Sequence, residues 1–481
     1  MSGCWITACL TYLFVIGLAS LVIWRLPLRR VLHSLTHLKF HAPEPFGWHG
    51  AEVPTYTALP EARAEKPAPK TELLPSVDAR DNMMLFHSWS EVPQDDWNSI
   101  VPEHQLFLQP AYLQAMEKAP TTHTQPRYGM LYREGLPTGI ATFQLIETPL
   151  DELGDSVDTN RVEKALRWTG SLHQTEDGRP AVRILLCGNA LVSDSCSMAH
   201  TNALTTQEML SALQHMTQTL QKQESKISPL TFVAIKDLTP EQTDEAGSLV
   251  QAGYHSLHID PTMTLHMREN WHTVDDYLAD MSSKYRQRYR ATRKKGKELV
   301  SKSMEAVEIE RNTVRLQELL HNVCENAPFR LTEVEIPSFV ELKRSMGDSF
   351  QFKGYYLEDK LVGFSAAFLK ASTNQEDRII ENNEERAPLE AYLVGIDYDY
   401  NHSHKIYLNM LYDFVEEGIA NGVPCVLLGR TAWEIKSTIG AEATYRITHI
   451  RHPNWLVNKL VSPLLNLVPP TKWKPRSPFK N

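Results

Sequence analysis

Apolar positions along this chain form short strand-like runs and longer helix-like periods, in an order that occurs twice. In the first half the order is strand 184–192, helix 205–222, strand 230–235 and helix 240–252. In the second half it is strand 389–400, helix 405–420, strand 423–428 and helix 431–439. Periods of two indicate half-buried strands, and periods near 3.6 indicate amphipathic helices. The pattern therefore predicts two α+β domains that share one architecture.

Similar hairpins precede the two sets of elements. One covers residues 127–143 and the other covers residues 352–368. Each reads as an apolar strand, a charged turn and a second strand that is entered through a glycine, which is the signature of a β-hairpin. We therefore expect each domain to place helices on a mixed, mainly antiparallel sheet.

The first 24 residues predict a membrane anchor. No charged side chain occurs between Gly3 and Trp24, and this length is enough to cross a bilayer. Arg25, Arg29 and Arg30 follow, and the positive-inside rule keeps such a flank in the cytoplasm. A cleaved signal peptide is the alternative, but its positive charges normally precede the apolar run. We expect a single-pass inner-membrane protein whose catalytic part is cytoplasmic.

Composition and length predict the remaining boundaries between the segments of the chain. Residues 41–75 hold seven prolines and no sustained apolar period, which is typical of an extended linker. A chain of 481 residues suits two domains. The predicted organisation is an anchor at 1–24, a basic flank and Pro-rich linker at 25–80, an N-terminal domain at 81–270, a basic interdomain helix at 271–302, a C-terminal domain at 303–452 and an amphipathic basic tail at 453–481. The tail either docks on the bilayer surface or packs across the two domains.

Net charge and cysteine content exclude several classes of protein. The net charge of −9 and pI near 6.1 argue against a general nucleic-acid binder, so DNA is not an expected partner. Six cysteines occur without a CxxC pair, and the closely spaced histidine pairs have no third ligand nearby in the sequence. We therefore expect neither a disulfide framework nor a bound metal.

One strongly basic segment interrupts this acidic average. Residues 284–302 carry nine cations and one acid. Anionic lipid headgroups, tRNA phosphates and a cofactor phosphate are the candidate ligands, and a solvated interdomain helix is the alternative. The candidate cofactor-binding residues are Lys284, Arg286, Arg290 and Arg293.

Over about residues 80–452 the sequence resembles the GNAT acyltransferases, in particular their tandem Fem-type and CelD-like branch. The most specific segments are YLADMSSKYRQRYR at 277–290 and GRTAWEIKSTIG at 429–440. The resemblance implies two GNAT-like domains and metal-free transfer of an acyl or aminoacyl group to an amine.

The chain departs from this family at the expected donor site. GNAT enzymes that use acyl-CoA usually carry a glycine-rich turn after the fourth strand, where backbone N–H groups bind the pyrophosphate. The equivalent stretches here, 193–200 and 401–409, contain no glycine. Acyl-CoA, an acyl carrier protein and an aminoacyl-tRNA therefore all stay open as the donor.

Acyl transfer to an amine needs a base, aligned reactants and donors for the oxyanion. Glu390 and Tyr392 share one face of a predicted central strand. Arg430 leaves the last core strand, and Glu434 follows four residues later, within reach on a helix turn. Glu434 is the candidate base, or it orients Arg430 toward a phosphate or carboxylate; Lys436 projects from another face. The alternative is a structural Arg–Glu pair.

These features together predict a membrane-anchored acyl- or aminoacyltransferase. Its acceptor would be an amine of a lipid, a cell-wall precursor or another envelope precursor, and its partners would be the inner membrane, anionic lipids and the acyl donor, with tRNA as a further candidate. The alternative is a non-catalytic scaffold that uses the same fold to bind a partner in envelope or polysaccharide biogenesis.

Overall fold

A computed structural model describes residues 72–74, 81–119, 121–154, 157–193, 197–258, 260–326, 330–369, 387–465 and 473–480. The predicted anchor at 1–24 lies outside these residues. Among the described helices, none combines the length and the apolar character that crossing a bilayer requires.

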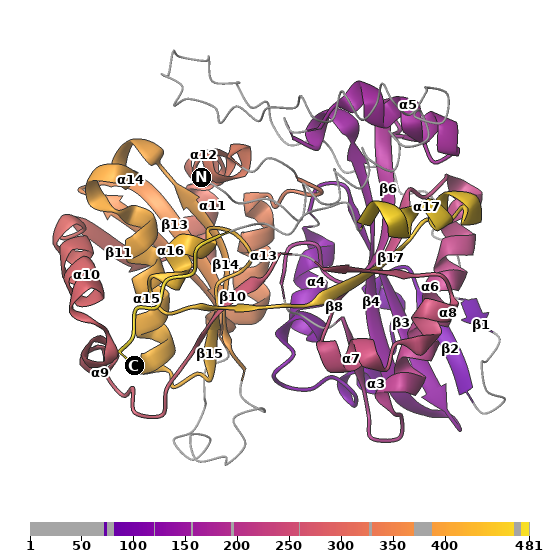
Figure 1. Ribbon diagram of the computed structural model, residues 1–481, viewed down its shortest axis with the longest axis horizontal. Helices are drawn as coiled ribbons and strands as arrows, with labels where there is room; N and C mark the ends of the chain where they lie inside the picture. Colours follow the sequence, from indigo (N-terminus) through magenta and orange to yellow (C-terminus); the bar gives the residue numbers. More distant parts are fainter. Residues whose placement is uncertain are drawn as a thin grey trace.

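The described strands form two mixed sheets, which make up the two lobes of the molecule (Figure 1). The first sheet has the order β1 (Glu72–Leu74), β2 (Asp81–Phe86), β3 (Thr124–Arg133), β4 (Leu136–Pro149), β6 (Pro180–Cys187), β8 (Phe232–Leu238), β17 (Ile447–Arg451) and β9 (His255–His258), with β5 (His173–Gln174) beside β6 and β7 (Met198–His200) beside β4. The second sheet has the order β11 (Leu299–Ser303), β12 (Phe350–Leu357), β13 (Lys360–Phe368), β14 (Leu389–Ile396), β15 (Cys425–Leu427), β10 (Thr262–His266) and β16 (Glu442–Thr444). Because β1 pairs with β2, folded structure begins inside the predicted linker.

Helices cover both sheets. Those of the first half are α3 (Gln94–Asn98), α4 (Pro110–Lys118), α5 (Thr159–Thr169), α6 (Thr206–Ile227), α7 (Pro240–Asp244) and α8 (Gly247–Gln251). Those that follow are α9 (Val274–Asp280), α10 (Ser283–Lys295), α11 (Ala306–Arg311), α12 (Thr313–Glu325), α13 (Ile336–Met346), α14 (Tyr398–His404), α15 (Ile406–Ala420), α16 (Trp433–Ser437) and α17 (Trp455–Leu465).

The two sheets repeat one strand order, as the sequence predicts. In each, a hairpin (β3–β4 or β12–β13) is followed by one parallel pair (β6–β8 or β14–β15), and the other described pairings are antiparallel. Parallel strands need a crossover connection, which α6 and α15 supply. Both halves therefore have the GNAT-like mixed sheet that the family resemblance implies.

Each half gives one strand to the other sheet. β10 follows β9 in the chain but inserts between β15 and β16 of the second sheet. β17 follows β16 but inserts between β8 and β9 of the first sheet, where it is the yellow strand in the purple lobe of Figure 1. The predicted domains 81–270 and 303–452 are therefore wrong about these two strands, because each domain includes one strand that belongs to the other sheet. Apolar alternation fits either sheet equally well, so the pattern alone does not show which sheet a strand joins.

Local signals explain most of the element bounds. Thr205 and Glu208 form a capping box that begins α6. The predicted helix 240–252 is two short helices, α7 and α8. The predicted strand 389–400 ends at Ile396, because the side chain of Asp397 accepts a hydrogen bond from the backbone N–H of Asp399 and caps α14.

One hydrophobic core joins the halves. Tyr112 and Phe107 of the first half pack against Phe368 of the second, with ring centroids 5.8 and 5.0 Å away. The tail also spans both lobes: α17 packs Val461 against the first sheet, and Phe479 packs against the second lobe beside Trp271. The described tail thus packs across the two domains, while Trp455 at the start of α17 is 64% exposed.

Candidate functional site

A cavity of about 380 Å³ lies between the two sheets. Its lining includes residues of β4, β6, β8, β9 and β17 from the first sheet and of β14, α16 and the turn after β15 from the second half. It therefore lies near the carboxyl ends of both parallel pairs, where open α/β sheets commonly bind ligands. Its volume falls within the range of small-molecule sites.

The second sheet opens toward this cavity. Within the described residues, the parallel pairing of β14 with β15 ends at Glu390 and Leu427, while β14 continues to Ile396. A β-bulge also interrupts the pairing of β13 with β14, and Tyr392 is the extra residue. Bulges redirect side chains next to active sites. Here Tyr392 lines the cavity.

A buried ion-pair cluster forms the polar end of the cavity. Arg430, at the end of the turn after β15, and Lys236 of β8 both donate to the carboxylate of Asp237. Lys236 Nζ also donates to the carbonyl oxygen of Val192 at 2.6 Å. Burial raises the pKa of Asp237, but the two cations outweigh burial and hold that pKa below its ordinary value. Asp237 has a φ of 62°, a strained conformation for a residue other than glycine, and such strain is concentrated at functional sites.

Lys436 lies on the same side of the cavity. Its side chain is 3% exposed, and Nζ donates to the carbonyl oxygen of Gly429 at 3.3 Å. Burial lowers the pKa of Lys436 to about 7, because removing the ammonium group from water disfavours its charged form. Near neutral pH the amine is thus poised to accept a proton.

Four buried polar atoms of lining residues have no hydrogen-bond partner within the described structure. They are Nε of Arg330, the hydroxyl of Tyr392, Nε of Arg430 and Oγ1 of Thr448; Arg430 and Thr448 are 9% and 5% exposed. A buried donor or acceptor without a partner costs about 1–3 kcal/mol. Thr448 lies on the exchanged strand β17, so that exchange helps to build the cavity. These atoms are therefore available to a polar group of a ligand.

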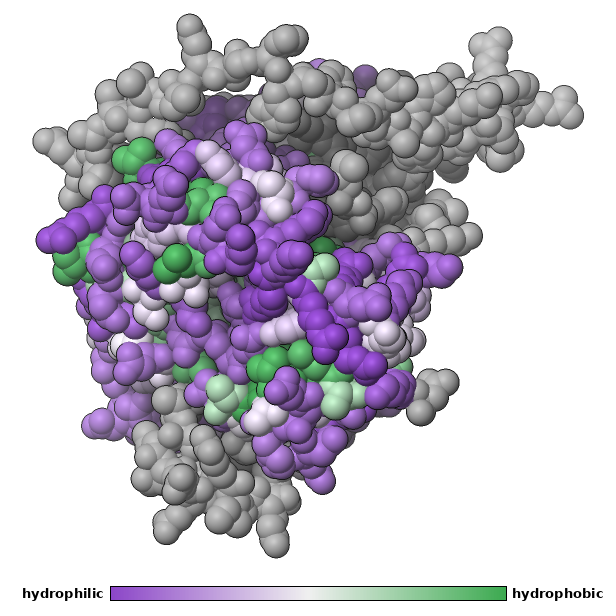
Figure 2. Space-filling view, turned by 90° about the vertical axis from the view of Figure 1, so that its left-hand side faces the viewer, coloured by the Kyte–Doolittle hydropathy of each residue, from purple (hydrophilic) through white to green (hydrophobic). Residues whose placement is uncertain are grey.

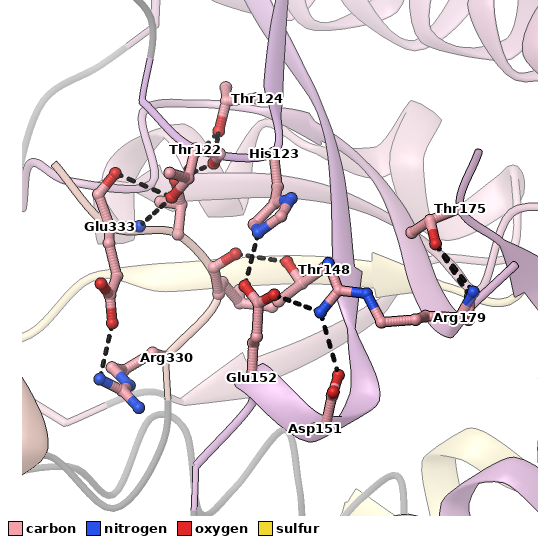
Figure 3. Close-up of polar contacts among 12 residues, drawn as sticks. Thr122, His123, Thr124, Thr148, Asp151, Glu152, Thr175, Arg179, Arg330 and Glu333 are labelled. Carbon is pink, nitrogen blue, oxygen red and sulfur yellow. Dashed lines mark hydrogen bonds and ion pairs between the residues drawn. The ribbon is translucent and has the colours of Figure 1, made fainter. Parts of the chain in front are cut away.

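A strap from the second half, residues 330–333, contributes to one side of the cavity. Figure 3 shows its polar contacts with the first half. Thr332 Oγ1 donates to the carbonyl oxygen of Thr122 at 2.6 Å, and the N–H of Thr122 donates to the carbonyl oxygen of Glu333 at 3.1 Å. Arg330 pairs with Glu333 at 2.6 Å. Arg330, Leu331 and Thr332 all line the cavity. The hydrogen bonds of the strap therefore hold this wall of the cavity against the first half.

A second polar network in Figure 3 holds the segment of the first half on which this strap rests. Glu152 contacts His123 Nε2 and Arg179 Nη1, each at 2.6 Å. The next residue, Leu153, accepts a hydrogen bond from the backbone N–H of Arg330 at 2.9 Å. The network therefore has a structural role outside the cavity lining.

The predicted pairing of Arg430 with Glu434 is wrong. Arg430 pairs with Asp237, whereas Glu434 is half exposed and pairs with Arg476 of the tail at 3.3 Å. The chain does not become helical until Trp433, after Ala432 in a left-handed conformation, so the spacing of four residues places the two side chains apart. Glu434 does not belong to the described lining of the cavity.

Glu390 lies beside the cavity rather than in its lining. Its carboxylate is buried near Tyr112, whose hydroxyl accepts a hydrogen bond from Asn189 Nδ2 at 2.7 Å. Burial raises the pKa of Tyr112, and the charge of Glu390 raises it further. Glu390 therefore belongs to the buried interface between the halves.

The four candidate cofactor-binding residues lie on α10, on the outer side of the second lobe (Figure 1). Arg293 pairs with Asp413 at 2.7 Å and with Glu416, which attaches α10 to α15. Arg286 donates to the carbonyl oxygen of Met281. Lys284 and Arg290 are exposed, on a side of the molecule that Figure 2 shows as mainly hydrophilic. None of the four lines the described cavity.

Sequence reasoning missed Lys236, Asp237 and Thr448. A signal for the first two was present, because a charged pair directly follows the predicted buried strand 230–235. Thr448 gave no such signal, since its position depends on the strand exchange. Among the described residues there is also no cluster of His, Cys, Asp or Glu that could hold a metal ion.

Comparison with known proteins gives structural neighbours only. No protein-family model and no curated protein matches the sequence. FemX matches 78% of this chain and 99% of its own, with 10% identity and a TM-score of 0.44. A tandem GNAT protein from the clavulanic acid biosynthesis pathway matches 71% of this chain and 86% of its own, with 9% identity and a TM-score of 0.39. A conserved protein of unknown function from Bacteroides thetaiotaomicron matches 76% of this chain and 98% of its own, with 6% identity and a TM-score of 0.42. The chain thus has neighbours among GNAT proteins, and its GNAT-like fold is recognised by the strand order of its two sheets.

Proposed function

We propose that the protein is an acyl- or aminoacyltransferase that transfers its group to an amine inside the cavity between the sheets. The observation that carries this proposal is the position of Lys436, buried beside Arg430 where β14 and β15 diverge. An amine acceptor is mostly protonated at neutral pH and must lose a proton before it can attack. A buried lysine with a pKa of about 7 suits that step.

The proposed reaction balances without a metal. The acceptor nitrogen, as the neutral amine, attacks the carbonyl carbon of the donor, and its proton passes to Lys436 Nζ. The bond from carbon to the leaving group then breaks, and Lys436 returns the proton to the leaving thiolate or alkoxide. Arg430 and Lys236 favour the negative charge that develops on the carbonyl oxygen or leaving group. Tyr392 at the bulge and the diverging backbone of β14 are candidate oxyanion donors.

Within the described residues, the crossover helices α6 and α15 do not begin at a glycine-rich turn of the kind that binds pyrophosphate. The first turn of α6 is capped by its own Thr205 and Glu208. In the second half, the segment before α15 forms the short helix α14. This arrangement favours no single donor, so acyl-CoA, an acyl carrier protein and an aminoacyl-tRNA all need to be compared.

We also propose that the protein works at the cytoplasmic face of the inner membrane. The charge pattern of residues 1–30 supports this orientation, and exposed cations on α10 such as Lys284 and Arg290 suit anionic lipids. The proposed acceptor is accordingly an amine of a lipid or another envelope precursor. A reporter fused to the C-terminus should be active only in the cytoplasm, and periplasmic activity would contradict this orientation.

The activity is tested with the full chain in phosphatidylcholine nanodiscs. Each labelled donor is offered with phosphatidylethanolamine, with an amine-bearing cell-wall precursor, or with neither. We expect one donor–acceptor pair to turn over and Lys436→Met to lower that turnover by about 100- to 10,000-fold. Glu434→Gln is the matched control, because its side chain lies outside the cavity. Unchanged turnover in Lys436→Met would remove the lysine from the reaction, and no turnover with any pair would favour the non-catalytic scaffold.

A further inference from the structure

We infer that the cavity binds an amphiphile, with an alkyl chain on the first sheet and an anionic group at Lys236 and Arg430. This inference rests on the proposed function, because it names the class of molecule that the same site would take. It goes further by assigning the alkyl chain to the first sheet and the anionic group to the cationic cluster at the boundary between the two sheets.

The apolar floor of the cavity consists of two cross-strand rows on one face of the first sheet. The pairing register places Ile146 opposite Ile184 and Ile184 opposite Phe232. The next row runs from Leu186 through Ala234 to Ile450, which lies on the exchanged strand β17. All six side chains line the cavity. An apolar surface formed mainly by β6 and β8 is suited to an alkyl chain rather than to a compact polar substrate.

The floor leads directly to the cationic end. Phe232, Ala234 and Lys236 alternate along β8 and therefore face the same side of the sheet. The four residues from Phe232 to Lys236 span about 13 Å at the rise of a β-strand. A chain that lies on the floor with its charged end at Lys236 would therefore extend about that distance toward Phe232.

Charge in the lining favours an anion. The described lining contains three cations, Lys236, Arg330 and Arg430, the amine of Lys436, and one carboxylate, Asp260. Asp237 and Glu333 lie behind the lining and pair with the three cations. Nε of Arg430 is nevertheless buried without a partner in the described structure, so it is a donor available to a ligand. Charge-assisted hydrogen bonds from a guanidinium suit a phosphate or carboxylate.

Binding is measured on the full chain in phosphatidylcholine nanodiscs, with decyl phosphate as the probe and inorganic phosphate as the comparison. We expect decyl phosphate to bind at least tenfold more tightly, because only it covers the apolar floor. Ala234→Phe fills the floor and should remove that advantage while leaving the affinity for inorganic phosphate unchanged. Ala291→Phe adds the same ring on the exposed surface of α10 and serves as the matched control. Equal affinities of the unmodified chain for the two probes would overturn the inference.

A second measurement needs no variant. A decyl phosphate that carries a photoreactive diazirine at the end of its chain is cross-linked to the unmodified protein and located by peptide mass spectrometry. The inference requires cross-links in β6, β8 or β17. Cross-links confined to other segments would overturn it, even if decyl phosphate binds tightly.

Two further competition experiments identify the source of the alkyl chain. Their results also test the inference independently of the proposed reaction. Decanoyl-CoA represents an activated acyl donor, and dihexanoyl phosphatidylglycerol represents a lipid; the one that displaces decyl phosphate at the lower concentration identifies the source. If the protein transfers acetyl groups with no dependence on chain length, the inference fails and the proposed function stands. If the chain binds as described but no donor turns over, the transferase proposal fails and the amphiphile site stands.

Discussion

Asp237 accepts a hydrogen bond from Arg430 across the boundary between the two sheets, and both side chains are buried. Asp237 lies near the end of β8, and Arg430 follows β15, so the pair joins the carboxyl ends of the two parallel pairs. The same contact fixes the guanidinium at the polar end of the cavity. The pair therefore connects the packing of the two lobes with the geometry of the proposed site.

Asp237→Asn should destabilise the protein strongly. The substitution leaves Arg430 and Lys236 buried without their shared counter-charge, which typically costs about 3–5 kcal/mol. Urea denaturation of the full chain would measure the loss in the free energy of unfolding. The double variant with Arg430→Met should recover part of it, because one buried charge is then removed. A loss below about 1 kcal/mol would show that the pair is not important for stability.

Lys436 should make stability and turnover depend on pH. The pKa of about 7 in the folded protein lies below the ordinary value of 10.5, so the unfolded state binds more protons between these pH values. The free energy of unfolding should therefore rise between about pH 7 and pH 10.5, by up to about 5 kcal/mol. Turnover should rise with pH through about 7 as the amine loses its proton. Lys436→Met should abolish the rise in stability, and a rise that persists in this variant would assign it to another group.

Glu434→Gln should have little effect. The carboxylate is 52% exposed and its ion pair with Arg476 is a surface contact, so we expect a loss of about 0–1 kcal/mol in stability. Turnover should stay within about twofold of the unmodified protein, because the side chain lies outside the lining. Thermal melting and a rate measured on the same preparation check both expectations. A loss of turnover without a loss of stability would return the residue to the catalytic site.

Substitutions of the cations on α10 should have two kinds of effect, because Arg293 has a structural role whereas Lys284 and Arg290 are exposed. Arg293→Gln removes contacts with Asp413 and Glu416 and should cost about 1–3 kcal/mol. Replacing the exposed Lys284 and Arg290 with Gln should leave stability within about 0.5 kcal/mol. It should also weaken binding to phosphatidylglycerol vesicles, by about 1 kcal/mol per cation. Vesicle co-sedimentation at several salt concentrations measures this, and unchanged binding would favour a solvated helix.

Acid should destabilise the protein through two histidines, His449 on the exchanged strand β17 and His452 directly after it. Burial lowers the pKa of His449 to about 4, with a further contribution from His258, and burial lowers the pKa of His452 to about 4 as well. The unfolded state therefore binds more protons between about pH 6.5 and pH 4, and stability falls as pH falls through this window, by up to about 3 kcal/mol for each residue. His449→Gln should reduce the dependence on pH measured by urea denaturation. An unchanged dependence in this variant would exclude His449 as its source.

The sequence by itself determined the local elements and their repetition. Apolar periods predicted both hairpins, the crossover helices α6 and α15 and the strands that flank them, because these features depend on neighbouring residues and on which face is buried. Arg430, Lys436 and Tyr392 were also identified as candidate site residues, and the structure brings all three to one cavity.

Only the tertiary structure decided which partners these residues have. Arg430 pairs with Asp237, 193 positions away, rather than with the nearby Glu434. The destinations of β10 and β17 were likewise open, because an apolar strand of alternating pattern can pair in either sheet. The cavity depends on such long-range contacts: its floor includes Ile450 from one exchange, and its lining includes Lys436, whose pKa is lowered by burial that no local pattern records.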